Sequence, residues 1–312
     1  MTGRELVVLG TASQAPTRYR NHNGYLLRFD GQGVLFDPGE GTQRQMLLAR
    51  VSSSMIDRIC ITHFHGDHCL GLPGVLGRLA LDRVARPVDL YYPGPGQEYL
   101  DRLCQASVAE VRPALRLHPV WGDGPVAEGD GDPGPAGGLR VVAGLLDHPT
   151  PTVGWRLEEP DRLHLLRPRL DELGVRGPDV GLLLAQGSVR VGSRTVGLDE
   201  VSEARRGQKV AFIMDTRWCD AAVELAAGVD LLVCESTFLE TEAGLADAYG
   251  HLTAAGAARL AAAAGARHLV LTHYSQRHPD EDDFLAEARA VFPSCRAARD
   301  LDVIPVPPRA AA

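Results

Sequence analysis

Short apolar or alternating runs recur along the chain and predict strands, and the longer stretches between them predict helices. In the first half we expect strands at Leu6–Leu9, Tyr25–Phe29, Val34–Phe36, Arg58–Thr62 and Val88–Tyr91, and helices at Thr42–Leu48, Leu72–Leu81 and Gln97–Ala106. In the second half we expect strands at Val210–Met214, Leu231–Cys234, His268–Thr272 and Asp302–Ile304, and helices at Ala221–Ala226, Thr253–Ala264 and Asp283–Val291. Two halves that each mix strands with helices indicate an α/β (α+β) fold with two sheets packed face to face and helices outside.

Two segments interrupt this alternation. Trp121–Gly138 is dominated by Gly, Pro and Asp, which predicts a surface loop of variable length. Pro160–Thr195 breaks the rhythm between the halves and is interpreted as an insertion or arm. The expected organisation is one domain over residues 1–312 with an inserted arm at 160–195.

The composition is that of an ordinary globular protein. Of the 312 residues, 45% are hydrophobic and 23% charged, which excludes collagen-like, coiled-coil and disordered classes. A net charge of −8 argues only weakly against a nucleic-acid partner, because the sum does not show where the charges lie.

The sequence predicts neither a membrane protein nor an exported one. It contains no run of about 18 apolar residues, and its first residues enter a strand-like run without the apolar core of a secretory signal. The six cysteines form no CxxC pair and indicate reduced thiols, so we expect a cytoplasmic protein.

The strongest chemical signal is the stretch from Thr62 to His68, directly after a predicted strand. Its His63, His65, Asp67 and His68 are four potential ligands within six residues, and imidazole with carboxylate suits a divalent metal such as zinc. A polar surface loop is the alternative, but this density of ligands favours a metal site.

These four residues do not provide a full set of ligands for either of two metal positions, so further ligands must come from elsewhere in the chain. Three candidates follow predicted strands, where a sheet would present them together: His148 after Val141–Leu146, Asp215 and His273. Each alone is weak evidence, because a lone histidine after a strand is more often an ordinary loop residue, but their shared placement favours all three together. Asp37 also ends a strand and is expected to orient an imidazole from behind, unless it only caps the following helix.

The motif His63-Phe-His65-Gly-Asp67-His68 resembles that of the metallo-β-lactamase superfamily. Narrower stretches are similar to the ribonuclease Z family, whose members trim the 3′ trailer from precursor tRNA. They begin with Gly-Thr at 10–11 and the Pro16 to Asn21 loop, and continue with the Asp37 to Gln45, His148 to Trp155, Asp215 to Arg217, Glu235 to Phe238, Gly250 to Thr253 and Leu271 to Arg277 stretches. The resemblance covers residues 6 to about 278 and implies an αββα sandwich with a dinuclear metal site at the sheet edge.

The resemblance also implies a ligand set and a cofactor. His63, His65 and His148 would hold one Zn²⁺, and Asp67, His68 and His273 a second, with Asp215 bridging both. Two Zn²⁺ per chain are therefore expected.

Catalytic roles follow from this arrangement. Asp67 is expected to hold and deprotonate the attacking water. His251, which lies outside the ligand set, is expected to protonate the leaving 3′-oxygen while Glu235 fixes its tautomer. The alternative for His251 is a cap of the helix that follows it.

The arm occupies the place of a tRNA-gripping exosite in bacterial relatives, and its Gly177-Pro178 is similar to that exosite's motif. Residues 161–195 contain six arginines against four acids, the sign that phosphate binding requires. A dimer contact or lid is the alternative. The expected substrate-binding residues are Arg18, Arg20, Arg162, Arg167, Arg169, Gly177 and Pro178.

Four positions depart from the family pattern without removing a ligand: Pro38, Cys234, Arg18 and His278. Arg18 replaces a lysine. The charge is kept, but the compact ammonium becomes a planar guanidinium with different hydrogen-bonding geometry.

The favoured function is a metal-dependent endoribonuclease that acts on precursor tRNA, as a homodimer and away from membranes. The alternatives are a hydrolase of small phosphodiesters or aryl sulfates and, more remotely, a non-catalytic RNA-binding scaffold. A bound metal and cleavage of a diester would exclude the scaffold.

Overall fold

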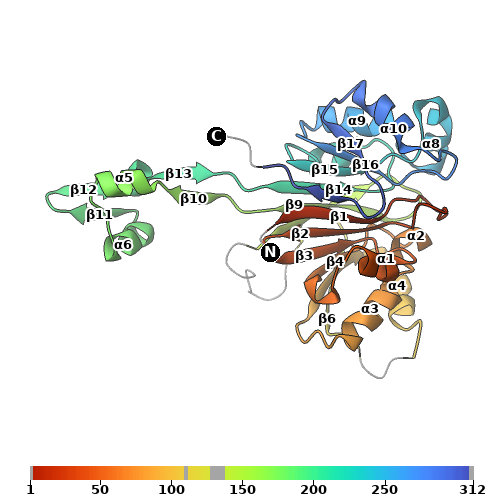
Figure 1. Ribbon diagram of the computed structural model, residues 1–312, viewed down its shortest axis with the longest axis horizontal. Coiled ribbons are helices and arrows are strands. Elements are labelled where there is room, and N and C mark those ends of the chain that lie inside the picture. The colour runs from red at the N-terminus through yellow and green to blue at the C-terminus, as the bar shows by residue number, and fades with distance from the viewer. Residues whose placement is uncertain (1–2, 109–111, 127–137, 309–312) are drawn as a thin grey trace. The chain divides into compact units, whose positions relative to one another are not determined.

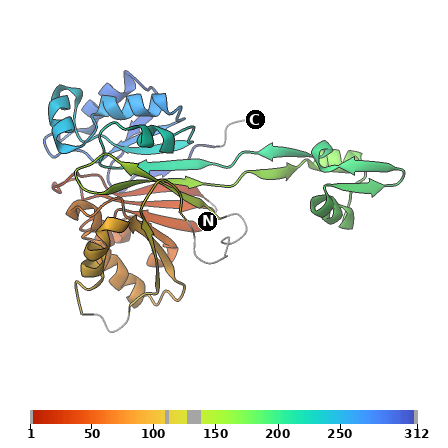
Figure 2. The same cartoon turned by 180° about the vertical axis from the view of Figure 1, so that it is seen from behind.

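The computed structural model describes residues 3–108, 112–126 and 138–308 and divides the chain into two compact units. The larger unit contains the residues up to 158 and from 209 to 308, and the smaller contains 159–208. In the larger unit, two sheets lie face to face with helices on both outer sides (Figure 1 and Figure 2). The expected αββα sandwich is confirmed.

Among the described residues, each sheet of the larger unit has seven strands. The first follows the order β18 (Val303–Pro305), β1 (Arg4–Gly10), β2 (Gly24–Phe29), β3 (Gln32–Phe36), β4 (Arg58–Cys60), β5 (Val88–Pro93) and β6 (Leu115–Val120). The second follows the order β17 (Cys295–Ala297), β16 (Leu269–Thr272), β15 (Leu231–Glu235), β14 (Lys209–Ile213), β9 (Thr152–Glu158), β8 (Arg140–Leu146) and β7 (Gly124–Pro125). The strands expected from the sequence are all present, with ends that agree to within two residues.

The central strands, such as β15 and β16, are buried on both faces. Successive side chains point to opposite sides of a sheet, and here the facing sheet covers one side and helices cover the other. In β14, Val210 and Phe212 face the space between the sheets, and Ala211 and Ile213 face the helices. Phe212 stacks on Phe36 of the first sheet, with ring centroids 4.4 Å apart. This aromatic contact helps to join the two sheets into one core.

Helices cover the outer faces. The helices α1 (Thr42–Leu48), α3 (Leu72–Leu81) and α4 (Gln97–Cys104) pack on the first sheet, and α7 (Asp220–Leu225), α9 (Ala254–Ala263) and α10 (Glu281–Arg289) pack on the second. Two short helices, α2 (Gly66–Cys69) and α8 (Ala243–Tyr249), follow β4 and β15. Among the described residues, none of the helices has the length and apolar character needed to cross a bilayer.

Parallel pairing decides where the loops meet. Strands β3, β4 and β5 are parallel neighbours in the first sheet, and β14, β15 and β16 are parallel neighbours in the second. The carboxyl ends of parallel strands lie at one edge of their sheet. Residues that follow these strands are therefore gathered at the sheet edges, although they are far apart in the sequence.

The smaller unit has its own elements and core. Strand β10 (Arg162–Leu165) pairs with β13 (Ser202–Arg205), β11 (Ser188–Val191) pairs with β12 (Arg194–Gly197), and the helices are α5 (Arg167–Glu172) and α6 (Pro178–Gln186). This unit extends 13 residues beyond the expected end at 195. The reason is physical: Val196 and Val201 belong to its buried core, and β13 is the pairing partner of β10.

The expected loop at Trp121–Gly138 is only partly tested. Residues 127–137 lie outside the described residues. The prediction is wrong at Gly124–Pro125, which form β7 and pair with Ala143 and Val142 of β8. A two-residue strand carries too little pattern to be recognised in a segment rich in Gly and Pro.

The pairing of the smaller unit leads to a test of its boundaries. Glu158 and Lys209 are opposite one another in the antiparallel pair β9–β14, so a two-residue Asn-Gly turn can replace 159–208. We expect this variant to unfold thermally at nearly the same temperature as the full chain. Deletion of 160–195 should instead lower the unfolding temperature or cause aggregation, because it leaves Val196, Val201 and β13 without partners. Equal behaviour of the two deletions in thermal unfolding would contradict these boundaries.

Candidate metal centre

Six loops bring nine polar side chains to one edge of the sandwich. The loop after β4 and helix α2 carry the His63 to His68 motif, and the ends of β3, β8, β14, β15 and β16 supply Asp37, His148, Asp215, Glu235 and His273. Three of these residues, Asp37, Asp215 and His273, have positive φ values of 41°, 43° and 62°. Non-glycine residues rarely adopt this left-handed conformation, and it costs free energy that is commonly stored at functional sites.

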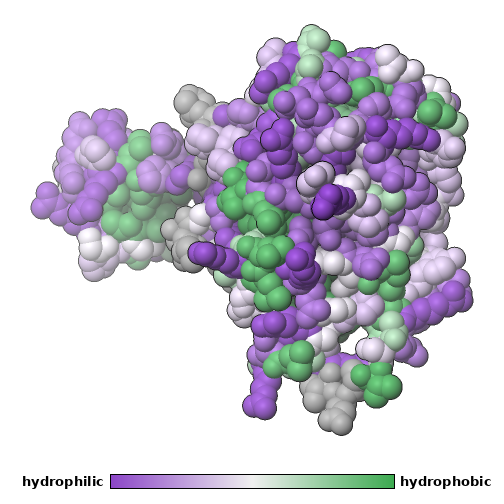
Figure 3. Space-filling model, turned by 45° about the vertical axis from the view of Figure 1, so that its right-hand side comes forward, coloured by the Kyte–Doolittle hydropathy of each residue, from purple (hydrophilic) through white to green (hydrophobic). Residues whose placement is uncertain are grey.

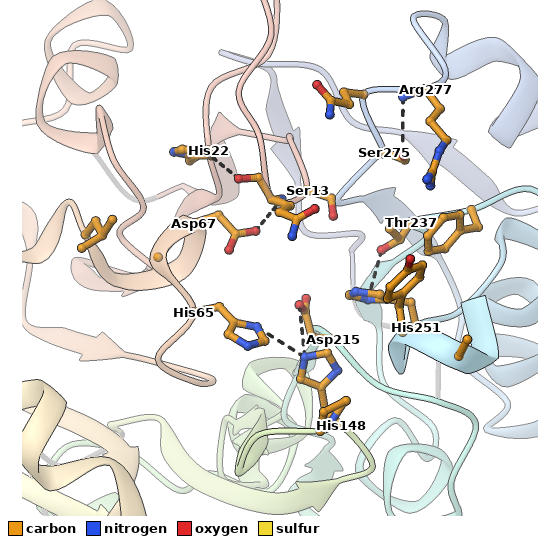
Figure 4. A pocket seen from close by; sticks show the side chains of 18 residues that line it. Ser13, His22, His65, Asp67, His148, Asp215, Thr237, His251, Ser275 and Arg277 are labelled. Carbon is orange, nitrogen blue, oxygen red and sulfur yellow. Dashed lines mark hydrogen bonds and ion pairs between the residues drawn. The ribbon is translucent and has the colours of Figure 1, made fainter. Parts of the chain in front are cut away.

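A first group of four side chains converges on one point. Figure 4 shows three of them, His65, His148 and Asp215. His63 Nε2 lies 2.9 Å from His65 Nδ1, and His148 Nε2 lies 3.5 Å from the same atom. Asp215 Oδ2 lies 3.4 Å from His63 Nε2 and 3.9 Å from His148 Nε2. These four residues could together hold a metal ion.

A second group lies on the other side of Asp215. His68 Nε2 and His273 Nε2 are 3.2 Å apart, and Asp67 Oδ2 is 3.4 Å from the first nitrogen and 3.5 Å from the second. Asp215 turns its other oxygen here, with Oδ1 3.4 Å from His68 Nε2 and 3.2 Å from His273 Nε2. The carboxylate of Asp215 thus faces both groups.

The donor atoms fit divalent cations. Tetrahedral zinc with bonds of about 2.0–2.1 Å separates its ligand atoms by about 3.3 Å, which is within the range of the distances above. Asp215 Oδ1 is buried and finds no hydrogen-bonding partner in the described part of the chain. A buried carboxylate oxygen among imidazole nitrogens is stabilised by a cation, so both groups have the chemistry and spacing of metal positions.

Hydrogen bonds behind the imidazoles orient them. Asp37 accepts from His68 Nδ1 at 2.9 Å and from the Thr62 hydroxyl at 2.7 Å, and burial raises its pKa. The Gly250 carbonyl accepts from His148 Nδ1 at 2.8 Å. When Nδ1 carries the proton, the lone pair of Nε2 points into the centre, as a metal ligand requires.

His251 and Glu235 form a pair beside the second group. His251 Nδ1 lies 3.1 Å from Glu235 Oε1, and the wholly buried Glu235 also accepts from the Thr216 backbone N–H at 2.7 Å. Burial works to lower the pKa of His251, but the charges of Glu235 and Asp215 raise it to about 9. The imidazole is therefore protonated at neutral pH and can donate a proton.

A contact to Asp67 was not anticipated from the sequence. The backbone N–H of Gln14 donates to Asp67 Oδ2 at 2.7 Å, and Gln14 has a φ of 55°. His22 Nε2 lies 3.1 Å from the Gln14 carbonyl and holds this turn. The sequence analysis selected this loop only for Arg18 and Arg20. It did not select Gln14, because Gln14 contributes its backbone N–H, which every residue except proline has.

The centre opens into a cavity of about 670 Å³. Asp67, His148, Asp215 and His251 line it, together with Phe238, Tyr249, Ser275 and Arg277. Figure 4 shows His65, Asp67, His148, Asp215 and His251 pointing toward a shared space from several elements. The volume accommodates a nucleotide-sized group beside the candidate metal positions.

The expected substrate-binding residues differ in their surroundings. Arg18 is exposed, but Arg20 is 4% exposed and donates to Glu281 at 2.7 Å. This burial argues against a substrate contact by Arg20, because its guanidinium is already paired with the Glu281 carboxylate.

The other five candidates belong to the smaller unit. Arg162 and Arg167 are exposed, Arg169 pairs with Glu172 at 2.8 Å, and Gly177 precedes Pro178, the first residue of α6. Over the whole unit, 159–208, eight arginines are balanced by eight carboxylates. The positive excess of residues 161–195 therefore does not extend to the unit as the structure defines it.

Sequence comparisons identify close relatives along the whole chain. Residues 17–163 match the metallo-beta-lactamase superfamily, and residues 195–274 match the beta-lactamase superfamily domain. A ribonuclease Z of Nocardia farcinica is 57% identical, with 99% of this chain and 100% of that protein covered. A ribonuclease Z of Chlamydia pneumoniae is 42% identical, with 98% of each covered. The crystal structure of the short form of human tRNase Z has the same fold, with a TM-score of 0.67 and 24% identity over 97% of this chain and 99% of that one.

The orienting role of Asp37 can be tested by metal binding. Asp37→Asn keeps the shape of the side chain but removes the charge that holds the His68 tautomer. We expect a loss of about 10–100-fold in Zn²⁺ affinity, measured by competition with a chromophoric chelator. Asp89→Asn is a matched control, because Asp89 also pairs with a histidine, His118, at 2.8 Å but lies outside both groups. Equal affinities of the two variants would contradict the role of Asp37.

Proposed function

Because the chain belongs to the ribonuclease Z family, we propose that it is an endoribonuclease that removes the 3′ trailer of precursor tRNA and leaves a 3′-hydroxyl on the tRNA. One observation of the structure carries this proposal: two groups of side chains that could hold metal ions lie on either side of the Asp215 carboxylate, and His251, whose pKa is raised to about 9, lies beside them at a common cavity. Hydrolysis of a phosphodiester needs charge neutralisation, an activated water and a proton for the leaving oxygen, and this arrangement contains residues for all three.

We propose two Zn²⁺ per chain as the cofactors. His63, His65 and His148 would hold one ion, and Asp67, His68 and His273 the other, with Asp215 shared. Such ions supply Lewis acidity, which activates water and neutralises negative charge on the phosphoryl oxygens. The mixture of imidazole and carboxylate ligands suits zinc.

Asp67 is the proposed general base. Its carboxylate lines the cavity and is only 8% exposed, and the charge of His68 keeps its pKa low although burial opposes this. The Gln14 N–H fixes one of its oxygens. In this position Asp67 can orient the attacking water and accept its proton as the bond to phosphorus forms.

His251 is the proposed general acid. The Glu235 carboxylate is paired with Nδ1 of His251, so Nε2 of the same ring is the nitrogen that can reach the substrate. As the phosphorus–O3′ bond breaks, the leaving oxygen takes the Nε2 proton and becomes the 3′-hydroxyl, while the trailer keeps the phosphate. The carboxylate of Glu235 stabilises the imidazolium before transfer and fixes the ring throughout.

The smaller unit, 159–208, is the proposed tRNA-binding exosite. Its exposed Arg162 and Arg167 and the Gly177-Pro178 turn support this assignment, and phosphate contacts depend on where charges lie rather than on the sum. Arg18 is proposed as a contact closer to the cut.

A homodimer in the cytoplasm is proposed as the working form. Figure 3 shows hydrophobic residues gathered in patches on an otherwise hydrophilic face. In the first-sheet layer, Leu47, Leu48 and Leu70 are 59%, 50% and 53% exposed, and a second copy of the chain would bury this apolar surface. The cytoplasmic location is proposed because the proposed substrate, precursor tRNA, is an intracellular RNA.

The function is tested with a precursor tRNA that carries a 3′ trailer. We expect a single cut just after the discriminator nucleotide, with a 3′-hydroxyl and a 5′-phosphate as the new ends, and loss of the cut when a chelator removes the metal. Mapping both ends by gel and mass spectrometry checks the result. Absence of cleavage by the zinc-loaded protein would contradict the proposal.

The variant that lacks 159–208 separates this function from its nearest alternative. A hydrolase of small phosphodiesters or aryl sulfates needs no exosite, so its activity would remain whole without this unit. For the proposed function we expect the variant to lose precursor tRNA cleavage and to retain hydrolysis of bis(p-nitrophenyl) phosphate.

The acid role of His251 predicts both a rate loss and a change in pH dependence. His251→Ala should lower kcat by about 10²–10⁴-fold while the bound metal is unchanged. Since the pKa of His251 is about 9, the imidazole loses its proton as the pH rises through this value, and wild-type cleavage should fall there. The variant should lack this alkaline decline. A near-normal rate with intact metal content would exclude the role.

A further inference from the structure

Two aromatic rings lie side by side at the cavity, outside the metal centre. The rings of Phe238 and Tyr249 are nearly parallel, at an interplanar angle of 14° with centroids 6.4 Å apart. Both residues line the same cavity as Asp67, Asp215 and His251. Neither has a part in the ligand set or in the proton transfers described above.

Phe238 is a rigid support. It is 4% exposed, its backbone forms a bridge with Thr253, and its carbonyl accepts from the Ala254 N–H at 2.9 Å. The Arg277 guanidinium carbon lies 5.7 Å from the centroid of its ring. The ring is therefore held by the fold and by a cation, and it can brace Tyr249.

Tyr249 has an open face. It is 56% exposed, and its hydroxyl makes no hydrogen bond within the part of the chain that the structure describes. Single exposed aromatic residues are common on protein surfaces and need no explanation. This one differs because it lines the candidate catalytic cavity and is parallel to a buried ring.

The position of Tyr249 is fixed by its neighbours in the chain. It is the last residue of α8, which Gly250 ends with a φ of 79°. A side chain at 250 would clash with His148, because a Cβ would lie 2.9 Å from Nδ1 of that ring. Residues 249, 250 and 251 thus bring an exposed ring, the carbonyl that orients His148 and the proposed acid to adjacent places.

We propose that Tyr249, braced by Phe238, is a stacking platform for the base of the nucleotide that carries the leaving 3′-oxygen. The assignment rests on the proposed function, because His251 protonates that oxygen and the centroids of the Phe238 and His251 rings are only 6.0 Å apart. The platform therefore belongs to the last nucleotide of the product tRNA rather than to the trailer. Stacking accepts any base, so it positions the nucleotide without selecting its identity.

A double-mutant cycle between the ring and the base tests the proposal. The substrates are a precursor tRNA, the same RNA with an abasic nucleotide just before the cut, and one with an abasic nucleotide just after it. On the intact substrate, Tyr249→Ala should raise KM by roughly 5- to 100-fold with kcat little changed, and Tyr249→Phe should behave as wild type. On the substrate that is abasic before the cut, Tyr249→Ala should have an effect of less than about twofold.

Control measurements distinguish a failure of the platform from a folding defect and from a failure of the proposed function. Tyr99→Ala removes another tyrosine that is 47% exposed but does not line the cavity, and it should leave KM unchanged. Metal content and thermal unfolding of each variant exclude a folding defect. An equal loss on intact and abasic substrates, or coupling to the nucleotide after the cut, would overturn the platform. If the wild type cleaves no precursor tRNA, the proposed function fails instead.

Discussion

The arrangement of the site depends on one buried carboxylate. Asp215 is 2% exposed, and its two oxygens face two separate groups of imidazole and carboxylate atoms at 3.2–3.9 Å. An isolated carboxylate in this place would be costly, because burial disfavours its charge. The histidines around it keep its pKa well below the ordinary value despite that burial. The buried negative charge of Asp215 needs positive charge nearby. Protonated histidines or bound cations can supply it at this edge of the sandwich.

The two sheets make this concentration of charge possible. Parallel neighbours in each sheet end at a common edge, and the stacked core of Phe36 and Phe212 holds the two sheets together. Left-handed turns at Asp37 and Asp215 then direct side chains from the strand ends into the centre. The free-energy cost of the strained backbone and the buried charge at the site is thus offset by apolar packing elsewhere in the fold, as is common in enzymes.

Much of this was predictable from the sequence, and the omissions have physical causes. The dense motif from His63 to His68 and the strand ends before Asp215 and His273 follow from side-chain type and periodicity, which are local properties. The contact of the Gln14 N–H with Asp67 was missed because any residue supplies a backbone donor. The burial of Arg20 against Glu281 joins residues 261 positions apart, and no local pattern records such a pairing. The end of the smaller unit was misplaced because Val196 and Val201 are isolated valines in a polar stretch.

Anomalous X-ray diffraction at the zinc absorption edge, from crystals grown with Zn²⁺, is the most direct test of the shared carboxylate. We expect two peaks of comparable height, one beside each oxygen of Asp215. A single peak, or two peaks that Asp215 does not touch, would contradict the arrangement on which the function rests.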